Sequence, residues 1–487
     1  MTELALGLDV GTQGTKALVI DVDRGAVVAR ATRSYGLLPG LAAGAAEQHP
    51  DTWWKAVVEC TREVAARVDA RALRGIGVSG QQHGFVALDR EGRVLRPAKL
   101  WCDTSTAAEA RELSQRLGRS VPTGFTASKI LWLKRHEPAH FARLAHVLLP
   151  HDYVNWRLTG AFSMEAGDAS GTGLFDVRER RFDGAACAAI DERLAGWLPA
   201  LLAPDQPAGT LTPAAARELG LEPGVLVAPG GGDNMCAAIG AGATRPGVAV
   251  LSLGTSATVF GYSERPVLDP AGLIAPFCDS TGGWLPLLCV MNATGVLHEV
   301  ESAFRATGLD LDALTRAAEG VAPGADGLLF LPFLQGERVP DLPEAAGALL
   351  GLRPGLLEPA RLFRAALEGT SLNLAWGVER LRALGLGVTG VRLVGGGARN
   401  ALWARILADV LDAPVQRLAE AESAALGAAL QAAWIARRAA REGVAIDALA
   451  ARFVAFDGEP FLPDRARGDV YRAALERFRD AAGRLYA

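Results

Sequence analysis

The sequence predicts an α/β protein built from two related domains around a cleft. Its 487 residues exceed what one hydrophobic core usually supports, so at least two domains are expected. Short apolar runs bounded by turn residues alternate with longer segments of helical periodicity, which is typical of α/β chains. The segments LGLDVGTQGTKALVI and LSLGTSATVFGY both consist of an apolar strand, a Gly-Thr turn and a second apolar strand. This similarity between the two halves predicts a duplicated fold.

The composition excludes several classes of protein. Apolar residues make up 50% and charged residues 21%, which is ordinary for a globular protein. A net charge of -4, with arginines scattered among acids, argues against a nucleic-acid partner. The N-terminus has an acid at Glu3 and no basic segment, and we find no apolar run of membrane-spanning length. We therefore expect a cytoplasmic protein with no membrane or nucleic-acid partner.

The first half of the chain begins with strands and turns. Apolar runs of strand length predict strands at residues 4–10, 16–22, 26–35, 75–79, 85–89 and 225–228. A helix is expected at about 51–68, where Pro50 and Asp51 form a start signal. Residues from about 105 to 220 are expected to be mostly helical and to form an insertion that caps the sheet.

The second half repeats the strand pattern. Further strands are predicted at residues 248–253, 257–262 and 391–394, with helices near 356–384 and from about 400. We place the domain boundary near residue 245, in the segment Ala243–Gly247. The two predicted domains are therefore residues 1–245 and 246–487.

The first candidate site is the turn from Asp9 to Lys16. Its glycines allow backbone N–H groups to turn inward and bind an anion, and its threonine hydroxyls add donors. Asp9, just before the turn, is suited to hold Mg²⁺ directly or through water. The alternative is an ordinary hairpin turn. The similar Gly254-Thr255-Ser256 turn favours the first interpretation, because two such turns across a cleft can hold one phosphate chain.

The second candidate is Gly230-Gly231-Gly232-Asp233-Asn234, which follows an apolar strand. The glycines allow a ligand to approach closely, and ligands of open α/β sheets gather at the carboxyl ends of strands. A carboxylate there is suited to remove the proton from an attacking hydroxyl in phosphoryl transfer. Asp233 is therefore the candidate base, and Asn234 is suited to orient a second hydroxyl. The alternative is that Asp233 caps the following helix.

Two further candidate sites involve three segments. The third candidate is Gly395-Gly396-Gly397-Ala398-Arg399-Asn400, where glycines follow a predicted strand and precede a predicted helix. Such glycines let a nucleotide base or ribose lie against the backbone. The alternative is a tight turn. Ser79–His83 and Leu100–Asp103 hold amide, imidazole, indole and carboxylate groups suited to read sugar hydroxyls. Taken singly, His83 and Trp101 are more often structural residues.

Several motif matches are rejected on local structure. Gly75-x-Gly77-x-x-Gly80 and Gly385-x-Gly387-x-x-Gly390 match the dinucleotide fingerprint, but neither opens a helix. The zinc-protease pattern at His136–His140 contains Pro138, which would interrupt the required helix. No GxxxxGK[ST] sequence is present, which excludes a P-loop enzyme. The six cysteines lack CxxC spacing and are expected to be reduced, mostly core, residues.

These motifs together resemble the FGGY carbohydrate kinases, which belong to the larger class of sugar kinases, actin and heat-shock chaperone ATPases. The resemblance covers essentially the whole chain. It rests, in order, on DVGTQGTK, SGQQHG, LWCDTS, LPHDYVNWRLTG, DASGTGLFDVRERRFD, APGGGDN, LSLGTSA and LVGGGARN. It implies two actin/hexokinase-like (ribonuclease H-like) domains that flank a catalytic cleft. Within the family the chain looks most like the xylulokinases, which phosphorylate D-xylulose to D-xylulose 5-phosphate with ATP and Mg²⁺.

The resemblance also implies roles for individual residues. Asp233 matches the proton acceptor, Asp9 and Asp233 are the residues expected near the metal, and sugar and ATP are the expected partners. The nucleotide-binding residues implied are Gly11, Thr12, Gln13, Gly14, Thr15, Lys16, Gly254, Thr255, Gly396, Gly397 and Asn400. The sugar-facing residues implied are Gln82, His83, Trp101, Asp103 and Asn234. The oligomeric state stays open, with a homodimer as one possibility.

Two positions depart from the xylulokinase pattern. Gln82 stands where SGQMHG has methionine, and Ser105 stands where LWxDxR has arginine; His151 also replaces a common lysine. Another pentulose or polyol, such as ribulose, arabinitol or glycerol, therefore stays open as the substrate. An alternative of another class is a chaperone-like ATPase of the same superfold that is not a kinase.

Overall fold

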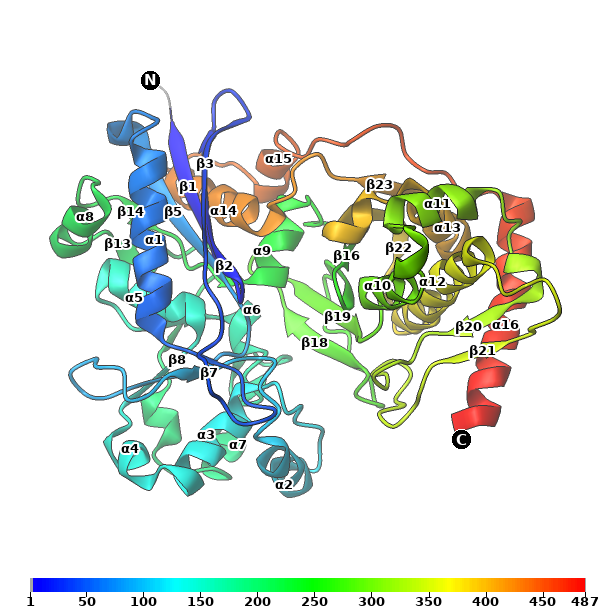
Figure 1. Ribbon diagram of the computed structural model, residues 1–487. Coiled ribbons are helices and arrows are strands. Elements are labelled where there is room, and N and C mark those ends of the chain that lie inside the picture. Colours follow the sequence, from blue (N-terminus) through cyan, green and yellow to red (C-terminus); the bar gives the residue numbers. More distant parts are fainter. Residues whose placement is uncertain (1–2, 487) are drawn as a thin grey trace.

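The computed structural model describes residues 3–486 and shows two α/β lobes side by side (Figure 1). Each lobe is organised around one mixed sheet with helices on its faces. The predicted fold class, two ribonuclease H-like α/β domains, is confirmed. No helix within residues 3–486 combines the length and apolar character needed to span a membrane.

The first lobe contains a seven-stranded sheet in the order β13-β14-β5-β1-β2-β3, with β15 also paired to β5. Its strands are β1 (Leu4–Val10), β2 (Gly14–Asp21), β3 (Ala26–Ser34), β5 (Leu73–Gly80), β13 (Gly209–Thr210), β14 (Leu226–Val227) and β15 (Gly231–Gly232). β1 runs antiparallel to β2 and parallel to β5, so the predicted N-terminal hairpin is confirmed.

The two faces of this sheet are covered by helices from distant parts of the chain. Leu6 and Leu8 pack with Trp53 of α1 (Pro50–Ala65), whereas Ala5 packs with residues of α14 (Ser423–Ala439). This alternation is the period of two expected for a strand that is buried on both faces. The α14 helix thus completes the core of the first lobe although it lies in the second half of the sequence.

Close contact with α14 explains three glycines in the sheet. A Cβ at Gly7 would lie 1.9 Å from the carbonyl oxygen of Ala425, and one at Gly77 would lie 2.0 Å from that of Ala428. Gly75 faces Ala432 in the same way. The glycines of the rejected dinucleotide pattern at residues 75–80 therefore lie within β5, and two of them make room for a helix.

The insertion between β5 and β14 is more mixed than predicted. Its helices are α2 (Ala107–Leu117), α3 (Thr126–His136), α4 (Pro138–Arg143), α5 (Pro150–Thr159), α6 (Ala166–Ala169), α7 (Gly184–Ala188) and α8 (Pro213–Leu219). Short strands also occur and form small two-stranded sheets between the helices. The first lobe's short strands outside the main sheet are β4 (Glu47–Gln48), β6 (Val86–Leu88), β7 (Ala98–Lys99), β8 (His146–Leu148), β9 (Ser163–Glu165), β10 (Phe175–Asp176), β11 (Arg181–Phe182) and β12 (Ala200–Leu202). As predicted, Pro138 interrupts the helix: α3 ends at His136 and α4 starts at Pro138. The two histidines of the rejected zinc pattern therefore lie on different helices.

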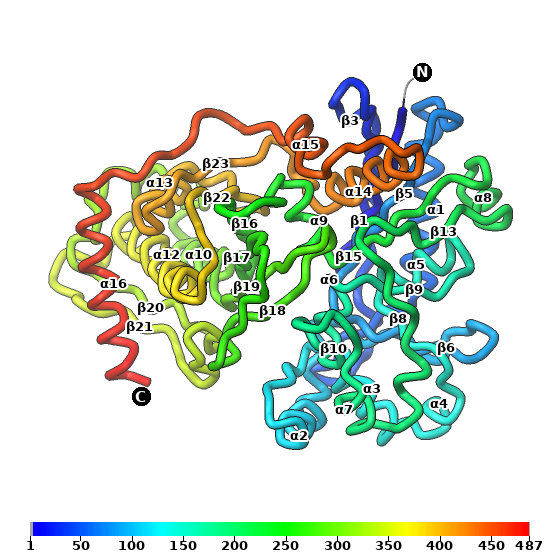
Figure 2. The backbone as a smooth tube through the Cα atoms, turned by 180° about the vertical axis from the view of Figure 1, so that it is seen from behind, coloured from blue at the N-terminus to red at the C-terminus, as the bar shows by residue number. Residues whose placement is uncertain are grey.

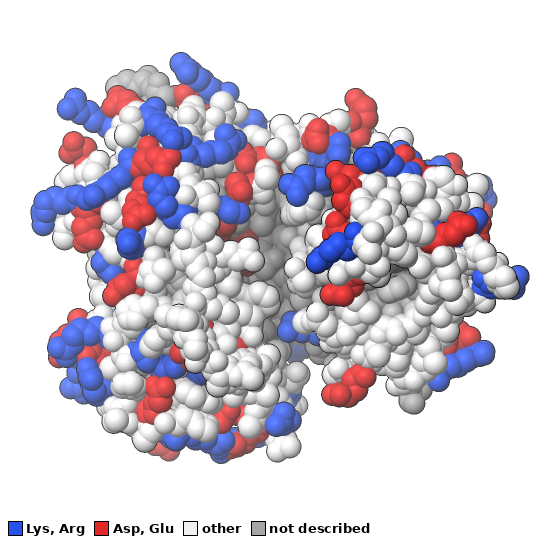
Figure 3. Space-filling view, viewed as in Figure 1, with Lys and Arg blue, Asp and Glu red and all other residues white. Residues whose placement is uncertain are grey.

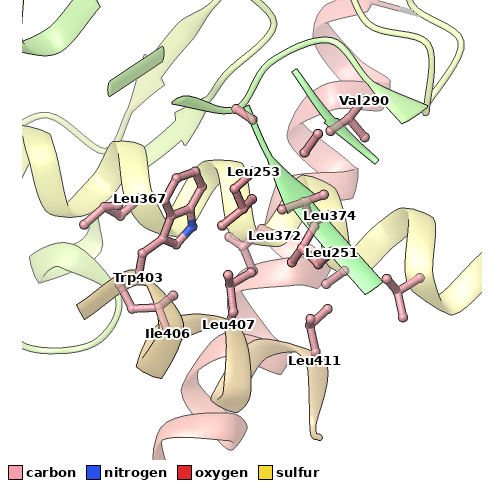
Figure 4. Close-up of a cluster of buried hydrophobic side chains, with 14 of the residues drawn as sticks. Leu251, Leu253, Val290, Leu367, Leu372, Leu374, Trp403, Ile406, Leu407 and Leu411 are labelled. Atoms are coloured by element: carbon pink, nitrogen blue, oxygen red, sulfur yellow. The ribbon is translucent and has the colours of Figure 1, made fainter. Parts of the chain in front are cut away.

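The second lobe contains a six-stranded sheet in the order β18-β19-β17-β16-β22-β23. Its strands are β16 (Gly247–Leu253), β17 (Ala257–Gly261), β18 (Ile274–Cys278), β19 (Trp284–Val290), β22 (Val388–Val394) and β23 (Val415–Arg417). Leu251 and Leu253 of β16 pack with Trp403 and Leu407 of α13 (Ala401–Leu411), as Figure 4 shows. The other helices and strands of this half are α10 (Thr294–Ala303), α11 (Leu311–Glu319), β20 (Leu329–Leu331), β21 (Ala348–Leu350), α12 (Pro359–Ala383), α15 (Ile446–Ala450) and α16 (Arg465–Tyr486). Short 3-10 helices lie at Ala70–Ala72, Leu194–Trp197, Arg305–Thr307, Ala325–Gly327 and Gly396–Arg399.

The two sheets share a five-strand core, β14-β5-β1-β2-β3 and β23-β22-β16-β17-β19, which agrees with the predicted duplication. In each, a parallel pair (β1 with β5, β16 with β22) lies beside an antiparallel hairpin (β1 with β2, β16 with β17). A helix follows the last parallel strand in each lobe: α9 (Asp233–Gly240) after β14 and β15, and α14 after β23.

These two equivalent helices join the lobes. α9 and α14 lie next to each other between the sheets (Figure 2). A Cβ at Gly427 of α14 would lie 1.8 Å from the carbonyl oxygen of Cys236, so the helices cross at backbone contact distance. Met235 and Ala238 of α9 pack with Val250 and Phe260 of the second sheet. The first residue of α9, Asp233, is thereby held between the two lobes.

The cysteines agree with the sequence prediction. All six are free, and Cys60, Cys187, Cys236 and Cys278 are buried. The predicted boundary near residue 245 lies in the connection between α9 and β16, while α14 packs on the first sheet.

Candidate active site

The candidate catalytic residues meet at one edge of the first sheet. Asp9 is paired in register with Ser79, and Gly231 of β15 is paired with the same serine. β1, β5 and β15 run parallel, so their carboxyl ends lie at the same edge. Asp9 and Asp233 therefore lie at the ends of the two strands that flank β5. Figure 3 shows a hollow between the two lobes. In that view charges of both signs cover the outer surfaces, while mostly uncharged residues border the hollow.

Asp9 is a half-buried carboxylate with one oxygen engaged. The Ser79 hydroxyl donates to Asp9 Oδ1 at 3.0 Å. Burial raises the pKa of Asp9 above its usual value, although the charge of Lys16 and the Ser79 hydrogen bond act in the opposite direction. The other carboxylate oxygen is not used by this hydrogen bond and is suited to a cation or a water ligand.

Asp233 is the first residue of α9, and Gly232 is the N-cap. The alternative interpretation of Asp233 as an N-cap is therefore wrong. Its Oδ1 accepts hydrogen bonds from the backbone N–H of Asn234 at 2.8 Å and from the Asn234 side chain at 2.9 Å. Burial, followed by the charges of Asp9 and Asp168, raises the pKa of Asp233 to about 7. A carboxylate with a pKa near neutrality is suited to accept a proton from a hydroxyl.

Asn234 makes contacts with both lobes. Its side-chain amide also donates to Gln82 Oε1 at 2.9 Å, and its carbonyl oxygen accepts from the Thr258 hydroxyl of β17 at 3.3 Å. The structure thus brings the predicted residues Gln82, Asp233 and Asn234 together. It also shows that the polar atoms of Asn234 already have partners within the chain.

His83 lies between aromatic side chains of the two lobes. Its ring centroid is 4.6 Å from that of Phe125 and 5.6 Å from that of Phe277. Burial, reinforced by the Lys129 charge, lowers the pKa of His83 to about 3, so the imidazole is neutral. The residue has a left-handed φ of 63°, and Lys129 Nζ donates to its backbone carbonyl at 3.0 Å. Its Nδ1 is buried and has no hydrogen-bond partner within residues 3–486.

Trp101 and Asp103 differ in their exposure. Trp101 is 40% exposed, and its indole N–H donates to the Thr12 hydroxyl at 3.0 Å. Asp103 is fully buried, and its oxygens accept from Lys99 Nζ at 3.1 Å and from the Ser105 hydroxyl at 2.5 Å. Trp101 therefore presents a ring surface next to the first turn, whereas both oxygens of Asp103 are used inside the protein.

The first glycine-threonine turn is closed by its own backbone. The Gly11 N–H donates to the Gly14 carbonyl at 3.0 Å. Gln13 is exposed, but Thr15 is fully buried and its hydroxyl is 3.1 Å from the Tyr35 hydroxyl. Lys16 forms an ion pair with Glu422, just before α14. Thr12, Gln13 and Lys16 are thus more accessible to a ligand than Thr15.

The second turn and the third glycine segment lie side by side. Ser252 of β16 pairs in register with Val394 of β22, so Gly254-Thr255 and Gly395–Gly397 follow adjacent parallel strands. Gly254, Thr255 and Gly396 are exposed. Space around Gly396 is open, whereas a Cβ at Gly397 would lie 2.8 Å from the Leu253 side chain.

Asn400 has a structural role in this region. Its Oδ1 accepts from the Trp403 backbone N–H at 3.0 Å and caps α13. Its amide donates to the Thr315 hydroxyl at 3.0 Å. These hydrogen bonds already occupy the Asn400 side chain. The predicted contact between Asn400 and adenosine stays a prediction.

The carboxylates fit a magnesium ion that arrives with a nucleotide. Within residues 3–486 no group of three or more His, Cys, Asp or Glu side chains could hold a metal by themselves. Mg²⁺ prefers oxygen ligands and usually binds one or two carboxylates together with phosphates and water. The half-buried Asp9, with Asp233 at the strand end on the other side of β5, matches that requirement.

A buried cluster of ionisable residues near Asp233 was not predicted from the sequence. His151, Asp168 and Glu165 are nearly or fully inaccessible, and His151 Nδ1 lies 2.8 Å from Asp168 Oδ2. His151 and Asp168 lie in the family motifs that begin LPHDY and DASG, and Glu165 lies three residues before Asp168.

Comparisons with known proteins agree with this arrangement. Residues 4–240 match the N-terminal domain model of the FGGY family of carbohydrate kinases, and residues 249–436 match its C-terminal domain model. The chain is 38% identical to the xylulose kinase of Haemophilus influenzae, over 99% of this chain and 100% of that one. It is 35% identical to the xylulose kinase of Escherichia coli, over 99% and 98% of the two chains.

A solved structure shows the same arrangement of both lobes. The xylulose kinase from Rhodospirillum rubrum superposes with a TM-score of 0.90 at 29% identity, covering 99% of each chain. The family models together match well over half of the sequence. The chain therefore belongs to the FGGY family of carbohydrate kinases.

Proposed function

We propose that this carbohydrate kinase transfers the γ-phosphate of ATP to D-xylulose, with Asp233 as the general base. The observation that carries the mechanism is the position of Asp233 between the lobes, with a pKa raised to about 7 by burial, Asp9 and Asp168. The sugar hydroxyl gives its proton to Asp233 while its oxygen bonds to the γ-phosphorus. The bond from that phosphorus to the bridging oxygen breaks, and ADP leaves with the electron pair.

The second lobe supplies the nucleotide site in this proposal. The exposed Gly254-Thr255 turn and Gly396 lie on adjacent strand ends and offer backbone to the phosphates and the adenosine. The first turn, with Thr12 and Lys16, approaches the phosphates from the other lobe. Asp9 and Asp233 would hold Mg²⁺, which neutralises phosphate charge when bound.

The first lobe supplies the sugar site. His83 is neutral and its buried Nδ1 has no partner within the described residues, and Trp101 is 40% exposed. An aromatic face and a few polar groups are what a small polyhydroxylated ligand requires. Asp103 contributes to this site by fixing the loop that carries Trp101, because its carboxylate is buried against Lys99.

Several observations favour xylulose over other polyols. The relatives that match nearly the full length of the chain are named xylulose kinases. Ser105 replaces the arginine of the xylulokinase pattern, but Lys99 lies 2.8 Å from the Ser105 hydroxyl and supplies a cation beside Asp103. This departure is therefore compensated inside the protein.

A substrate panel tests the proposal. ADP formation is measured with ATP, Mg²⁺ and, separately, D-xylulose, ribulose, arabinitol and glycerol, and the values of kcat/KM are compared. We expect D-xylulose to give the highest value, with a 5-phosphate product. A higher value for another polyol would replace xylulose as the substrate. Turnover that responds to peptides and to no sugar would instead support the chaperone-like alternative.

A further inference from the structure

We propose that Gln82 is a positioning residue that fixes the Asn234 carboxamide, and through it the Asp233 carboxylate, against the buried pair His151–Asp168. The inference rests on the proposed role of Asp233 as the base. It assigns to Gln82 a role other than contact with the sugar.

The contact between Gln82 and Asn234 defines the near end of this arrangement. The Asn234 amide nitrogen lies 2.9 Å from Gln82 Oε1 and also 2.9 Å from Asp233 Oδ1. One donor group thus connects the glutamine to the base. Thr258, from the second lobe, donates to the opposite side of the same carboxamide at 3.3 Å. The orientation of Asn234 is therefore set by three different segments.

The far end lies in the buried cluster. Within the described residues, Gln82 Nε2 and Asp168 Oδ1 are both buried without a hydrogen-bond partner. Burial raises the pKa of Asp168, and the nearby His151 and Gln82 side chains act in the opposite direction. On its other side Asp168 is 2.8 Å from His151 Nδ1. The flanking carboxylates of Asp152 and Asp168 outweigh the effect of burial and raise the pKa of His151 well above its usual value.

Three glycines show that the surrounding backbone is shaped around these side chains. A Cβ at Gly232, the N-cap of α9, would lie 2.7 Å from Gln82 Cγ. A Cβ at Gly80 would lie 2.8 Å from the His151 backbone nitrogen, and one at Gly230 would lie 3.0 Å from His151 Cδ2. Gly232 thus leaves room for Gln82, and Gly230 leaves room for the Val78 carbonyl oxygen and His151. The predicted approach of a ligand to the glycines at 230–232 stays a prediction.

This packing explains why glutamine matters at position 82. Methionine, the residue of the xylulokinase pattern, has a similar length, but its thioether sulfur is only a weak acceptor for a hydrogen bond from Asn234. With methionine there, Thr258 and Asp233 alone would orient the Asn234 carboxamide. A base that is less well oriented lowers the rate of the chemical step rather than the affinity for either substrate.

A double-mutant cycle tests the proposal. Gln82→Met, Asp168→Asn and the double variant are compared with the wild type by steady-state kinetics and thermal unfolding. The assay uses whichever sugar of the panel the wild type accepts best, so a wrong substrate assignment does not affect this test. We expect Gln82→Met to lower kcat about tenfold, the scale of one lost hydrogen bond, with each KM changed less than about twofold. The double variant should be no slower than Gln82→Met alone.

Control variants separate positioning from folding. Tyr471→Phe removes a buried hydroxyl in the second lobe that bonds Arg364 and Glu368, so it should lower Tm without changing kcat. Thr258→Val removes the other restraint on Asn234 and should also lower kcat selectively, which keeps the test available if Gln82→Met does not fold. The proposal would be overturned by an unchanged kcat in Gln82→Met or by a change only in the KM for sugar. It would also be overturned if the effects of Gln82→Met and Asp168→Asn multiplied in the double variant.

Discussion

Lys16, in the first glycine-threonine turn, forms an ion pair with Glu422, the residue just before α14. Partial burial lowers the pKa of Lys16, but the hydrogen bond and charge of Glu422 outweigh it, so the lysine stays protonated. This pair joins the turn between β1 and β2 to the helix that links the two lobes. In the proposed mechanism the same ammonium group lies where it can exchange Glu422 for a phosphate oxygen.

The first prediction concerns this lysine. Lys16→Met removes a charged donor to the phosphates, so the KM for ATP should rise about tenfold or more at saturating sugar. Glu422→Gln is the matched control, because it frees Lys16 and should leave the KM for ATP unchanged or lower it. Stability should change by less than about 1 kcal/mol in either variant, since the pair is partly exposed. Equal KM values in the wild type and Lys16→Met would contradict a phosphate contact.

The second prediction concerns the base. Asp233→Ala should lower kcat by roughly 10² to 10⁴, the usual scale for losing a general base. Folding should be retained, because Gly232 rather than Asp233 is the N-cap of α9. Steady-state kinetics and circular dichroism measure the two effects. A variant that folds and remains fully active would remove Asp233 from the mechanism.

The third prediction is a pH dependence. Asp233 must be deprotonated to act, and its pKa is raised to about 7, so kcat/KM should fall as the pH drops below about 7. The Asp168 charge contributes to that increase, so Asp168→Asn should lower the pKa and move the acidic limb to lower pH. Glu222→Gln, at an exposed position, serves as the control and should leave the profile unchanged. A limb that stays in place in Asp168→Asn would show that another group titrates.

Much of the fold could be predicted from local patterns. The strand at 4–10 was predicted with the bounds of β1, and the strands beginning near 248 and 257 lie close to β16 and β17, because turn residues mark their ends. The packing of α14 on the first sheet could not be predicted in this way. It depends on contacts between residues more than 300 positions apart, and a strand glycine alone does not show which helix lies against it.

The site was predicted less completely than the fold. Spacing placed Asp9 and Asp233 at strand ends, and the structure brings both to one sheet edge. The burial of Thr15 and Asp103 could not be read from sequence, since a turn pattern does not say which hydroxyl or carboxylate faces inward. The same holds for Gln82, whose residue type differs from the family pattern but whose partners come from separate segments.

The last prediction concerns the contact between α14 and the first sheet. A Cβ at Gly77 would lie 2.0 Å from the Ala428 carbonyl oxygen, which is backbone and cannot move without shifting the helix. Gly77→Ala should therefore destabilise the protein by about 1–3 kcal/mol or more, the range for overpacked cores. Gly390→Ala in β22 is the control, because no atom lies within 4 Å of the added methyl group. Because α14 also contacts α9, Gly77→Ala should lower kcat as well as Tm. A Gly77→Ala variant with wild-type Tm would show that α14 is not held against the first sheet in solution.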